Sequence, residues 1–332
     1  MPILLVVTPI EHIAGVAEKL TSAFETTVTP DPTLEDLTGQ LEQADAIYTN
    51  PNKSRLPIDS ALFDRAPRLK IVATASTGLL HIDVVEARRR GIDVVSLTSE
   101  YATIERISST AEHALALTLA ALRHIPDAAA DVMAGNWDYE RFIGRQMDML
   151  TVGVVGYGRL GKKYARYTDA IGARVLVCDP AYTRESCIFP MADLPTLMAE
   201  SDIVSLHVHA TPENFGLVDH ALLERAKPSL LLVNTSRGEV VDEASVVRFL
   251  RAHPAAMLAT DVLTDELTHK WDSPLLALAR SGGQVLVTPH IGGMTTEAQE
   301  IAYHRTADML IERFAERSAI KSPAAADARQ RD

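Results

Sequence analysis

The sequence predicts an α/β protein built from two doubly wound parallel sheets, each covered by helices. Short β-branched segments alternate with helical patterns along the chain, and this alternation is typical of βαβ units with parallel strands. The 332 residues also match about two domains of ordinary size. Because βαβ crossovers are right-handed, we expect helices on both faces of each sheet.

Composition excludes several classes of protein. The chain is 47% hydrophobic and 23% charged, which disfavours disordered, collagen-like and coiled-coil proteins. A formal net charge of -12 disfavours binding to nucleic acid or to an anionic membrane, and no apolar stretch is long enough to span one. The two cysteines, Cys178 and Cys187, suit a reducing cytoplasm and cannot form a thiolate metal site. We therefore expect a cytoplasmic protein with no metal, nucleic-acid or membrane partner.

The first third of the chain supplies one series of elements. Strands are expected at residues 2–7, 46–49, 71–75 and 92–96, where apolar and β-branched residues cluster. A helix is expected at 81–90, because its last turn is rich in arginine and a glycine follows it.

A second series begins near residue 108. A long apolar helix runs to about Arg123, and Ser109 with Glu112 has the pattern of a capping box. Strands are then expected at 151–155, 174–178, 203–207, 230–233, 257–260 and 285–287. The last helix is expected at about 295–317, followed by a mobile tail from about Ser318.

A glycine-rich turn follows the strand at 151–155 and precedes a helical pattern. Its sequence is Gly156-Tyr157-Gly158-Arg159-Leu160-Gly161. The first glycine permits a tight turn, the second lets the backbone approach a pyrophosphate, and the third lets helix and strand pack closely. The helix N-terminus adds an anion site. The pattern predicts a Rossmann-like dinucleotide site; a glycine turn without cofactor and a site for a methyl-donor nucleotide are the alternatives.

The choice of dinucleotide depends on Asp179. This residue ends the next strand, about twenty residues after the turn, where a carboxylate accepts the hydroxyls of the adenosine ribose. A carboxylate there repels a 2′-phosphate, so the sequence favours NAD over NADP. Arg184 lies close enough along the chain to keep NADP as the alternative.

Three later strands are each followed by a polar residue suited to catalysis. Arg237 follows the strand at 230–233, Glu266 follows 257–260, and His290 follows 285–287. Ligands of open α/β sheets bind at the carboxyl ends of the strands. There an Arg binds a carboxylate or polarises a ketone, and a His held by a Glu supplies a proton, as reduction of a 2-oxo acid requires. Taken singly, these residues could be a turn arginine, a solvated glutamate and a capping or core histidine.

With these motifs, nearly the whole chain resembles the D-isomer-specific 2-hydroxyacid dehydrogenase family, which includes D-lactate, glycerate, 3-phosphoglycerate and phosphite dehydrogenases. The resemblance implies an NAD-dependent enzyme that interconverts a D-2-hydroxy acid and its 2-oxo acid. It also implies a discontinuous substrate domain, residues 1–101 plus 296–332, and a cofactor domain, 102–295, with the active-site cleft between them. A homodimer is expected, and a small 2-hydroxy or 2-oxo acid is the expected partner.

The resemblance also assigns roles to single residues. It implies catalytic roles for Arg237, Glu266 and His290, in which Arg237 binds the substrate carboxylate. The backbone of a loop in the first domain is expected to bind the same carboxylate, through Thr77, Gly78 and Leu79. The expected cofactor-binding residues are Gly156, Gly158, Arg159, Leu160, Gly161, Asp179, His207, Thr235, Asp261 and Thr110.

Some features of the sequence leave the identity of the substrate undecided. The chain departs from the family pattern at Leu80, His81, His209 and Leu267. Lys53 and Arg55 could bind a distal anionic group of the substrate, or they could be two solvated surface charges. The alternatives to a 2-hydroxyacid dehydrogenase are a phosphite-type dehydrogenase and a non-catalytic NAD-binding regulatory module.

Overall fold

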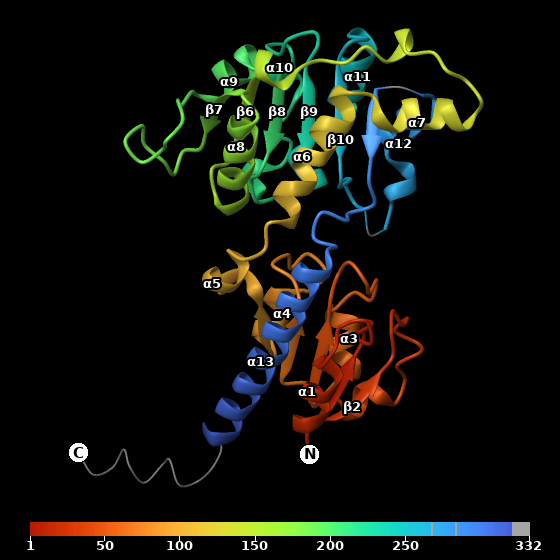
Figure 1. Cartoon of the computed structure of the whole chain (residues 1–332). Helices are drawn as coiled ribbons and strands as arrows, with labels where there is room; N and C mark the ends of the chain where they lie inside the picture. The colour runs from red at the N-terminus through yellow and green to blue at the C-terminus, as the bar shows by residue number, and fades with distance from the viewer. Residues whose placement is uncertain (267, 283, 321–332) are drawn as a thin grey trace. The chain divides into compact units, whose positions relative to one another are not determined.

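The computed structural model describes residues 1–266, 268–282 and 284–320. The chain forms two compact α/β units, each with its own parallel sheet (Figure 1). The first consists of Met1–Ile107 together with the described residues from Met294 on, and the second of Ser108–Gly293. The sequence places these divisions near residues 102 and 296. The short helix α5 (Tyr101–Ile104) packs on α13 (Thr296–Ile320), so both helices belong to the first unit.

The first unit contains five parallel strands in the order β2-β1-β3-β4-β5. Their bounds are β1 (Ile3–Val6), β2 (Glu25–Val28), β3 (Ala46–Thr49), β4 (Ile71–Thr74) and β5 (Asp93–Ser96). The sequence does not reveal β2, because this edge strand is polar and mostly exposed. The other four strands lie where they are predicted, to within a residue at each end.

Helices cover both faces of this sheet. One face carries α1 (Val16–Ala23), α5 and α13, and the other carries α2 (Gln40–Gln43), α3 (Ser60–Arg65) and α4 (Val84–Arg89). The two layers have separate apolar cores on opposite sides of the strands. Helix α13 begins more than 180 residues after the first segment of the unit ends, and it still buries Tyr303, Ala307 and Leu310 in that unit's core.

The second unit contains six parallel strands in the order β11-β10-β9-β8-β6-β7. Their bounds are β6 (Thr151–Val155), β7 (Arg174–Cys178), β8 (Ile203–Leu206), β9 (Leu231–Asn234), β10 (Met257–Thr260) and β11 (Val285–Val287). The direction of winding reverses between β6 and β8, and ligands of doubly wound sheets bind at such a point. All six strands match their predictions to within a residue.

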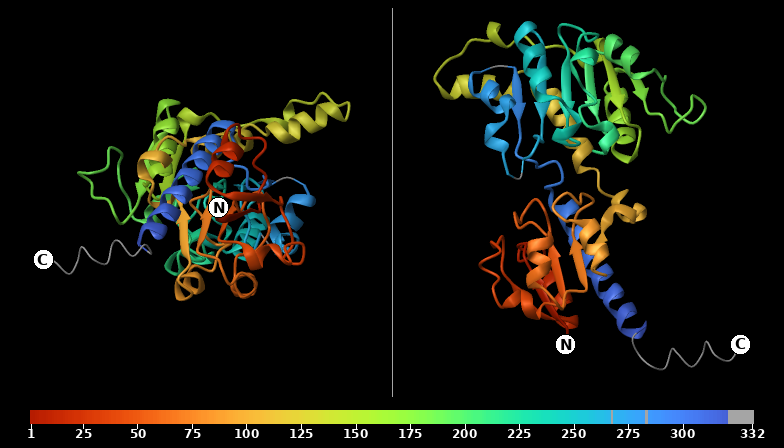
Figure 2. Two further views of the ribbon diagram at one scale, coloured as in Figure 1. Left: turned by 90° about the horizontal axis from the view of Figure 1, so that it is seen from below. Right: turned by 180° about the vertical axis from the view of Figure 1, so that it is seen from behind.

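Helices α6 (Ser109–Leu122) and α8 (Arg159–Ala170) cover one face of this sheet. The other face carries α9 (Leu194–Glu200), α10 (His220–Leu223), α11 (Glu243–Ala252) and α12 (Pro274–Arg280). Helix α7 (Ile125–Met133) buries none of its side chains. In the two further views, it extends away from the sheet of its own unit (Figure 2). No helix in the described ranges is long and apolar enough to cross a lipid bilayer.

Short 3-10 turns complete the connections: η1 (Leu97–Ser99), η2 (Glu140–Phe142), η3 (Met147–Met149), η4 (Pro212–Asn214), η5 (Gly238–Val240) and η6 (Lys270–Asp272). Two local predictions are wrong. The hydroxyl of Ser108, not Ser109, bonds to Glu112, and the buried Ser109 hydroxyl has no hydrogen-bond partner among the described residues. Ser318 lies inside α13, which continues to Ile320, and the rest of the predicted tail lies outside the described residues.

Candidate active site

The predicted residues of the second unit follow the carboxyl ends of all six strands. The glycine turn follows β6, Asp179 follows β7, and His207 follows β8. Arg237, Glu266 and His290 follow β9, β10 and β11, which are neighbours in the sheet. Because the strands are parallel, these residues share one edge of the sheet, with the glycine turn, Asp179 and His207 on one side and the catalytic candidates on the other.

The glycine turn is built so that its middle residue is open. Gly156 has a φ of +92°, and a Cβ added there would lie 2.6 Å from the carbonyl oxygen of His207. A Cβ on Gly161 would overlap the carbonyl oxygen of Gly156. By contrast, a Cβ on Gly158 would meet no protein atom within 4 Å. Packing therefore explains Gly156 and Gly161, whereas Gly158 leaves room for a ligand to approach the backbone.

Asp179 is fixed beside this turn by two backbone amides. Its Oδ2 accepts a hydrogen bond from the Tyr157 amide at 2.6 Å, and its Oδ1 accepts one from the Ala181 amide at 2.8 Å. Each carboxylate oxygen can accept a further bond, because each has two lone pairs. The carboxylate is thus held next to the glycine turn with capacity left for hydroxyl donors.

These features fit a dinucleotide. Gly158 is open, and Arg159 and Leu160 begin α8, whose first amides have no intrahelical acceptor and suit a phosphate. The Thr235 hydroxyl after β9 is buried without a partner among the described residues, so it has a hydrogen bond to give. His207 has a different character: burial lowers the pKa of its imidazole to about 3, so the ring is neutral and bonds to Ser205.

The half-buried His290 contacts Glu266 directly. The Nδ1 atom of His290 meets Oε1 of Glu266, and the other carboxylate oxygen of Glu266 accepts from the Leu263 amide at 3.3 Å. A carboxylate only accepts hydrogen bonds, so Nδ1 carries the proton of this bond. Proton transfer to or from a ligand is then the task of Nε2, the other ring nitrogen.

His290 lies on a turn that Asp261 holds in an uncommon conformation. Its φ of 55° is in the left-handed region, which is uncommon for residues other than glycine, although Asn, Asp and His adopt it more often than the others. The carbonyl of Asp261 accepts from the His290 amide at 2.8 Å, and its carboxylate accepts from the amides of Ile291 at 2.9 Å and Gly292 at 2.7 Å. Asp261 therefore fixes the backbone on which the candidate acid stands.

Further donors keep Asp261 ionised. Burial raises its pKa, but hydrogen bonds from His113, Thr288 and the two backbone amides outweigh this effect and hold the pKa of Asp261 below its ordinary value. Thr110 lies alongside, since a Cβ on Gly292 would be 3.0 Å from Oδ2 of Asp261 and 3.3 Å from the Thr110 methyl group. The structure thus brings Thr110, Asp261 and the His290 turn together.

Arg237 carries an uncompensated charge. Its guanidinium donates to the Ser236 carbonyl at 2.6 Å, and no carboxylate among the described residues pairs with it. Asn234 holds the turn, because its side chain donates to the Arg237 carbonyl at 2.8 Å and accepts from the amide of Ser236 at 3.0 Å. A half-buried, unpaired guanidinium suits a ligand carboxylate.

The loop of the first unit expected to bind the substrate carboxylate follows β4. The Gly78 amide donates to the Ser76 hydroxyl at 3.0 Å, so it already has a partner. The amides of Thr77 and Leu79 donate to no acceptor among the described residues. The role of Thr77, Gly78 and Leu79 stays a prediction, and the free donors are those of Thr77 and Leu79.

Sequence reasoning missed the residues that support the site: His113, Asn234, Gly238 and Glu243. Three of them contact segments far along the chain, about which a motif contains no information: His113, Gly238 and Glu243. Asn234 instead bonds to Ser236 and Arg237 within its own turn. Leu267, the departure next to Glu266, lies outside the described residues. Within the described ranges, no three His, Cys, Asp or Glu side chains gather as a metal ion would need.

Comparison with known proteins shows which family the chain resembles. Residues 115–292 match the family model described as D-isomer specific 2-hydroxyacid dehydrogenase, NAD binding domain. The chain is 38% identical over 274 residues to D-3-phosphoglycerate dehydrogenase of Mycobacterium tuberculosis, an alignment that covers 82% of this chain and 49% of the relative. It is 32% identical to hydroxypyruvate reductase of Thermotoga maritima, over 74% of this chain and 78% of that protein.

A solved structure is similar over almost the full length. The D-lactate dehydrogenase of Aquifex aeolicus, complexed with NAD and lactic acid, matches with a TM-score of 0.79 and 26% identity, over 95% of both chains. The chain spans about half the length of the phosphoglycerate dehydrogenases that it matches. The family model lies within the second unit, which is therefore an NAD-binding domain. The chain belongs to the D-isomer specific 2-hydroxyacid dehydrogenase family.

Proposed function

We propose that the protein reduces a 2-oxo acid to a D-2-hydroxy acid with NADH, and catalyses the reverse reaction with NAD. One observation carries the proposal: a His290–Glu266 pair and Arg237, which no carboxylate of the described residues neutralises, lie at the carboxyl ends of three neighbouring strands. A proton donor and a carboxylate-binding cation in this arrangement are what reduction of a 2-oxo acid needs.

Each of these residues has a distinct task in the reaction. Arg237 binds the substrate carboxylate and turns the carbonyl carbon toward the cofactor. When bound, NADH supplies the hydride to that carbon. His290 donates the proton on Nε2 to the carbonyl oxygen, so the 2-oxo acid, one hydride and one proton give the 2-hydroxy acid and NAD. Glu266 accepts from Nδ1, which orients the ring and stabilises the imidazolium before the proton leaves.

The first unit suggests a substrate with an anionic far end. Its direction of winding reverses between β1 and β3, and at that point Nζ of Lys53 lies 2.8 Å from Nε2 of His12. Burial lowers the pKa of Lys53, and no carboxylate among the described residues pairs with it. The expectation for Arg55 changes, because its side chain is paired with Asp31 at 2.7 Å and its charge is neutralised. Lys53 is therefore the better candidate for a distal phosphate or carboxylate.

The proposal is tested by loss of NADH absorbance in the presence of a panel of 2-oxo acids, with and without a terminal phosphate or carboxylate. We expect turnover of at least one member and formation of the D isomer of the product. Oxidation of phosphite but of no 2-hydroxy acid would replace this function with that of a phosphite dehydrogenase. Tight NADH binding without turnover of any substrate would favour a regulatory module.

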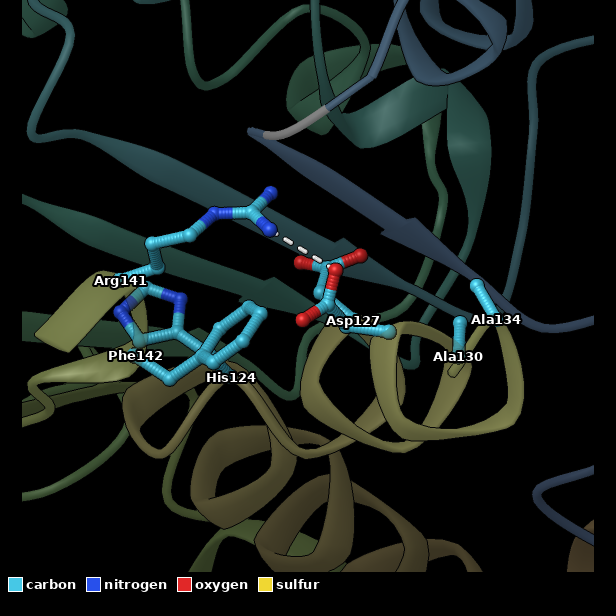
Figure 3. Close-up of a pocket in the computed structure, with 7 residues that line it drawn as sticks. His124, Asp127, Ala130, Ala134, Arg141 and Phe142 are labelled. Carbon is cyan, nitrogen blue, oxygen red and sulfur yellow. Dashed lines mark hydrogen bonds and ion pairs between the residues drawn. The ribbon is translucent and has the colours of Figure 1, made fainter. Parts of the chain in front are cut away.

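We also propose that the protein is a homodimer that associates through the segment around α7. This segment exposes large apolar side chains, among them Met133 at 87% and Trp137 at 85%. The same segment contains a pocket of about 480 Å³, lined by His124, Asp127, Asp131, Arg141, Phe142 and two alanines (Figure 3). Exposed apolar surface of this kind marks interaction sites.

Sedimentation of the wild-type protein should give a dimer, and the double variant Val132→Glu with Met133→Glu should give monomers. A wild-type monomer at micromolar concentration would contradict the proposal.

The proposed location is the cytoplasm. Cys178 and Cys187 are both free thiols, and this suits a reducing compartment. Fractionation of cells should recover the protein with cytoplasmic markers.

A further inference from the structure

Glu243 is a buried carboxylate that does not serve the helix on which it stands. It is the first residue of α11, but Asp242 caps that helix by accepting from the Ala244 amide at 3.2 Å. Glu243 is only 9% exposed. Both of its oxygens bond to another segment: Oε1 accepts from the Thr264 amide at 2.9 Å, and Oε2 accepts from the Ser273 hydroxyl at 2.6 Å.

These two partners lie near the two ends of one loop. The loop runs from the end of β10 to the start of α12, and Ser273 caps α12 by accepting from the Leu275 amide. Glu266 lies inside this loop, two residues after Thr264. One carboxylate therefore fixes both ends of the segment that presents Glu266 to His290.

The same peptide also contacts the Arg237 turn. A Cβ on Gly238 would overlap the backbone of Leu263 and Thr264, so the two segments touch at this glycine. Arg237 is the residue directly before Gly238. The Leu263–Thr264 peptide thus packs against the Arg237 turn and is hydrogen-bonded to Glu243. The position of this peptide therefore determines the position of Glu266 relative to Arg237.

We propose that Glu243 is a positioning residue for the reaction, which acts by holding the Glu266 loop against the Arg237 turn. The inference rests on the proposed function and adds a residue to it. A carboxylate suits this task because it accepts from both donors at once, whereas alanine leaves both donors without a partner. Loss of the contact lets the loop move, and Glu266 then no longer holds His290 in the orientation for proton transfer.

The test compares four variants by steady-state kinetics. Glu243→Ala should lower kcat by about 10- to 100-fold, the cost of slight misplacement of catalytic groups, while the KM for NADH stays near its wild-type value. Glu243→Gln should recover most of kcat, since its amide oxygen still accepts from Thr264 and Ser273 can reverse its bond. Ser273→Ala, which removes one of the two bonds, should be intermediate. Asp242→Asn is the matched control: it removes a charge at the same helix end without touching the loop.

A second readout does not depend on turnover. Nitrogen-15 spectra of the histidine rings distinguish a protonated Nδ1 from a bare one, and the His290 signals are assigned by their loss in His290→Asn. We expect a protonated Nδ1 in the wild type and in Asp242→Asn, and a mixture of tautomers in Glu243→Ala. If the wild type reduces no 2-oxo acid, the proposed function fails, while these spectra still decide the role of Glu243.

The inference is overturned by any of three results: a Glu243→Ala variant with wild-type kcat and tautomer, a wild type without a protonated Nδ1, or equal losses in Glu243→Ala and Asp242→Asn. The last result would mean that the end of α11 matters only for stability. If Glu243→Ala does not fold, Ser273→Ala and Glu243→Gln carry the same comparison, and wild-type behaviour of both would overturn the inference.

Discussion

At the scale of the residue, His290 is the group whose loss should affect chemistry and not binding. Replacement by Ala or by Asn removes the proton donor, and we expect kcat for 2-oxo acid reduction to fall by about 10²- to 10⁴-fold. The dissociation constant for NADH should change little. Fluorescence titration with NADH and stopped-flow absorbance measure the two quantities.

Comparison of His290→Ala with His290→Asn distinguishes the effect of losing the proton donor from the effect of a disturbed backbone. His290 has a φ of 55°, and Asn adopts this conformation more readily than Ala. Equal losses in both variants are expected if the proton donor alone matters. Near-normal turnover by His290→Asn would exclude His290 as the acid.

Asp179 should set the preference for NADH. Asp179→Ser together with Pro180→Arg removes the charge that repels a 2′-phosphate and adds one that attracts it, so kcat/KM should shift toward NADPH. The structure adds a cost, because Asp179 also accepts from the amides of Tyr157 and Ala181. We therefore expect the variant to lose kcat/KM with NADH by more than it gains with NADPH.

The control for this exchange is Arg184→Ala, which leaves the carboxylate in place. It should keep the preference for NADH. A wild-type enzyme that already prefers NADPH would contradict the role of Asp179 and make Arg184 the residue to examine.

The residues proposed to touch ligands could be located in the sequence because parallel strands bring their carboxyl ends to one edge. Once the strands β9, β10 and β11 were predicted, the polar residues that follow them identified Arg237, Glu266 and His290 as candidates. The residues that support them were not predictable, since Glu243 meets Thr264 and Ser273 across 21 and 30 positions of sequence. Such contacts depend on packing, which no local pattern reveals. The carboxylate of Asp261 holds the His290 turn through bonds that also span about thirty positions of sequence.

At the scale of the element, the two sheets use the same device to anchor their first strands. Asp45 directly precedes β3 and accepts from the Ile3 amide at the start of β1, at 3.0 Å. Asp202 directly precedes β8 and accepts from the Thr151 amide at the start of β6, also at 3.0 Å. Each pairs with two cations, Asp45 with Arg68 and Lys70, and Asp202 with Arg145 and Lys227.

These carboxylates predict a loss of stability in acid. Burial raises the pKa of each, but its bonds to cations and to a backbone amide outweigh burial, so the folded pKa lies below the ordinary value. A lowered pKa contributes stability that is present above the unfolded pKa, near 4, and is lost as pH falls through the folded pKa. Asp45→Asn and Asp202→Asn should each lower the free energy of unfolding by about 1 to 3 kcal/mol at pH 7.

The difference between wild type and variants should narrow below about pH 4, because the wild-type carboxylates then become protonated. Urea unfolding at a series of pH values measures it. A gap that stays constant down to pH 3 would contradict the assignment of acid sensitivity to Asp45 and Asp202.

Hydrophobic periodicity in the sequence located the buried strands well, because buried strands consist of apolar residues. It located exposed segments poorly, because their residues are not restricted in this way. The strands buried on both faces were found, because they read as continuous apolar runs. The edge strand β2 was missed because its residues are mostly polar and exposed, so they form no apolar run. The end of α13 was placed three residues early, at Arg317, whereas the helix continues to Ile320.

At the scale of the whole molecule, the two units differ in how the chain forms them, because the chain leaves the first unit and later returns to it. The second unit, Ser108–Gly293, is continuous and contains both of its core layers. The first unit is divided, and α13 completes it from the far end of the sequence. Two domains could be predicted from length and alternation, but the return of the last helix came only from resemblance to a family, because no local pattern specifies which sheet a helix covers.

This division predicts how fragments of the chain behave. Residues 108–293 alone should unfold cooperatively and bind NADH, because every core contact of that unit and the glycine turn are retained. Residues 1–107 alone should not fold stably. They lack Tyr303, whose hydroxyl meets Thr8 and whose carbonyl accepts from Tyr48, together with the buried Ala307 and Leu310. Removing several large buried side chains costs about 2 to 5 kcal/mol each, which is comparable to the whole stability of a small domain.

The decisive fragment joins residues 1–107 to 294–320 through a flexible Gly/Ser linker. Restoring α13 should restore a cooperative thermal transition, whereas a joined fragment with Tyr303→Ala should unfold at a lower temperature, because the core then contains a cavity where the ring was. Circular dichroism during heating measures both. If residues 1–107 alone unfold with the same midpoint as the joined fragment, α13 contributes nothing to that core. The return of the chain would then serve the geometry of the enzyme and not the stability of its first unit.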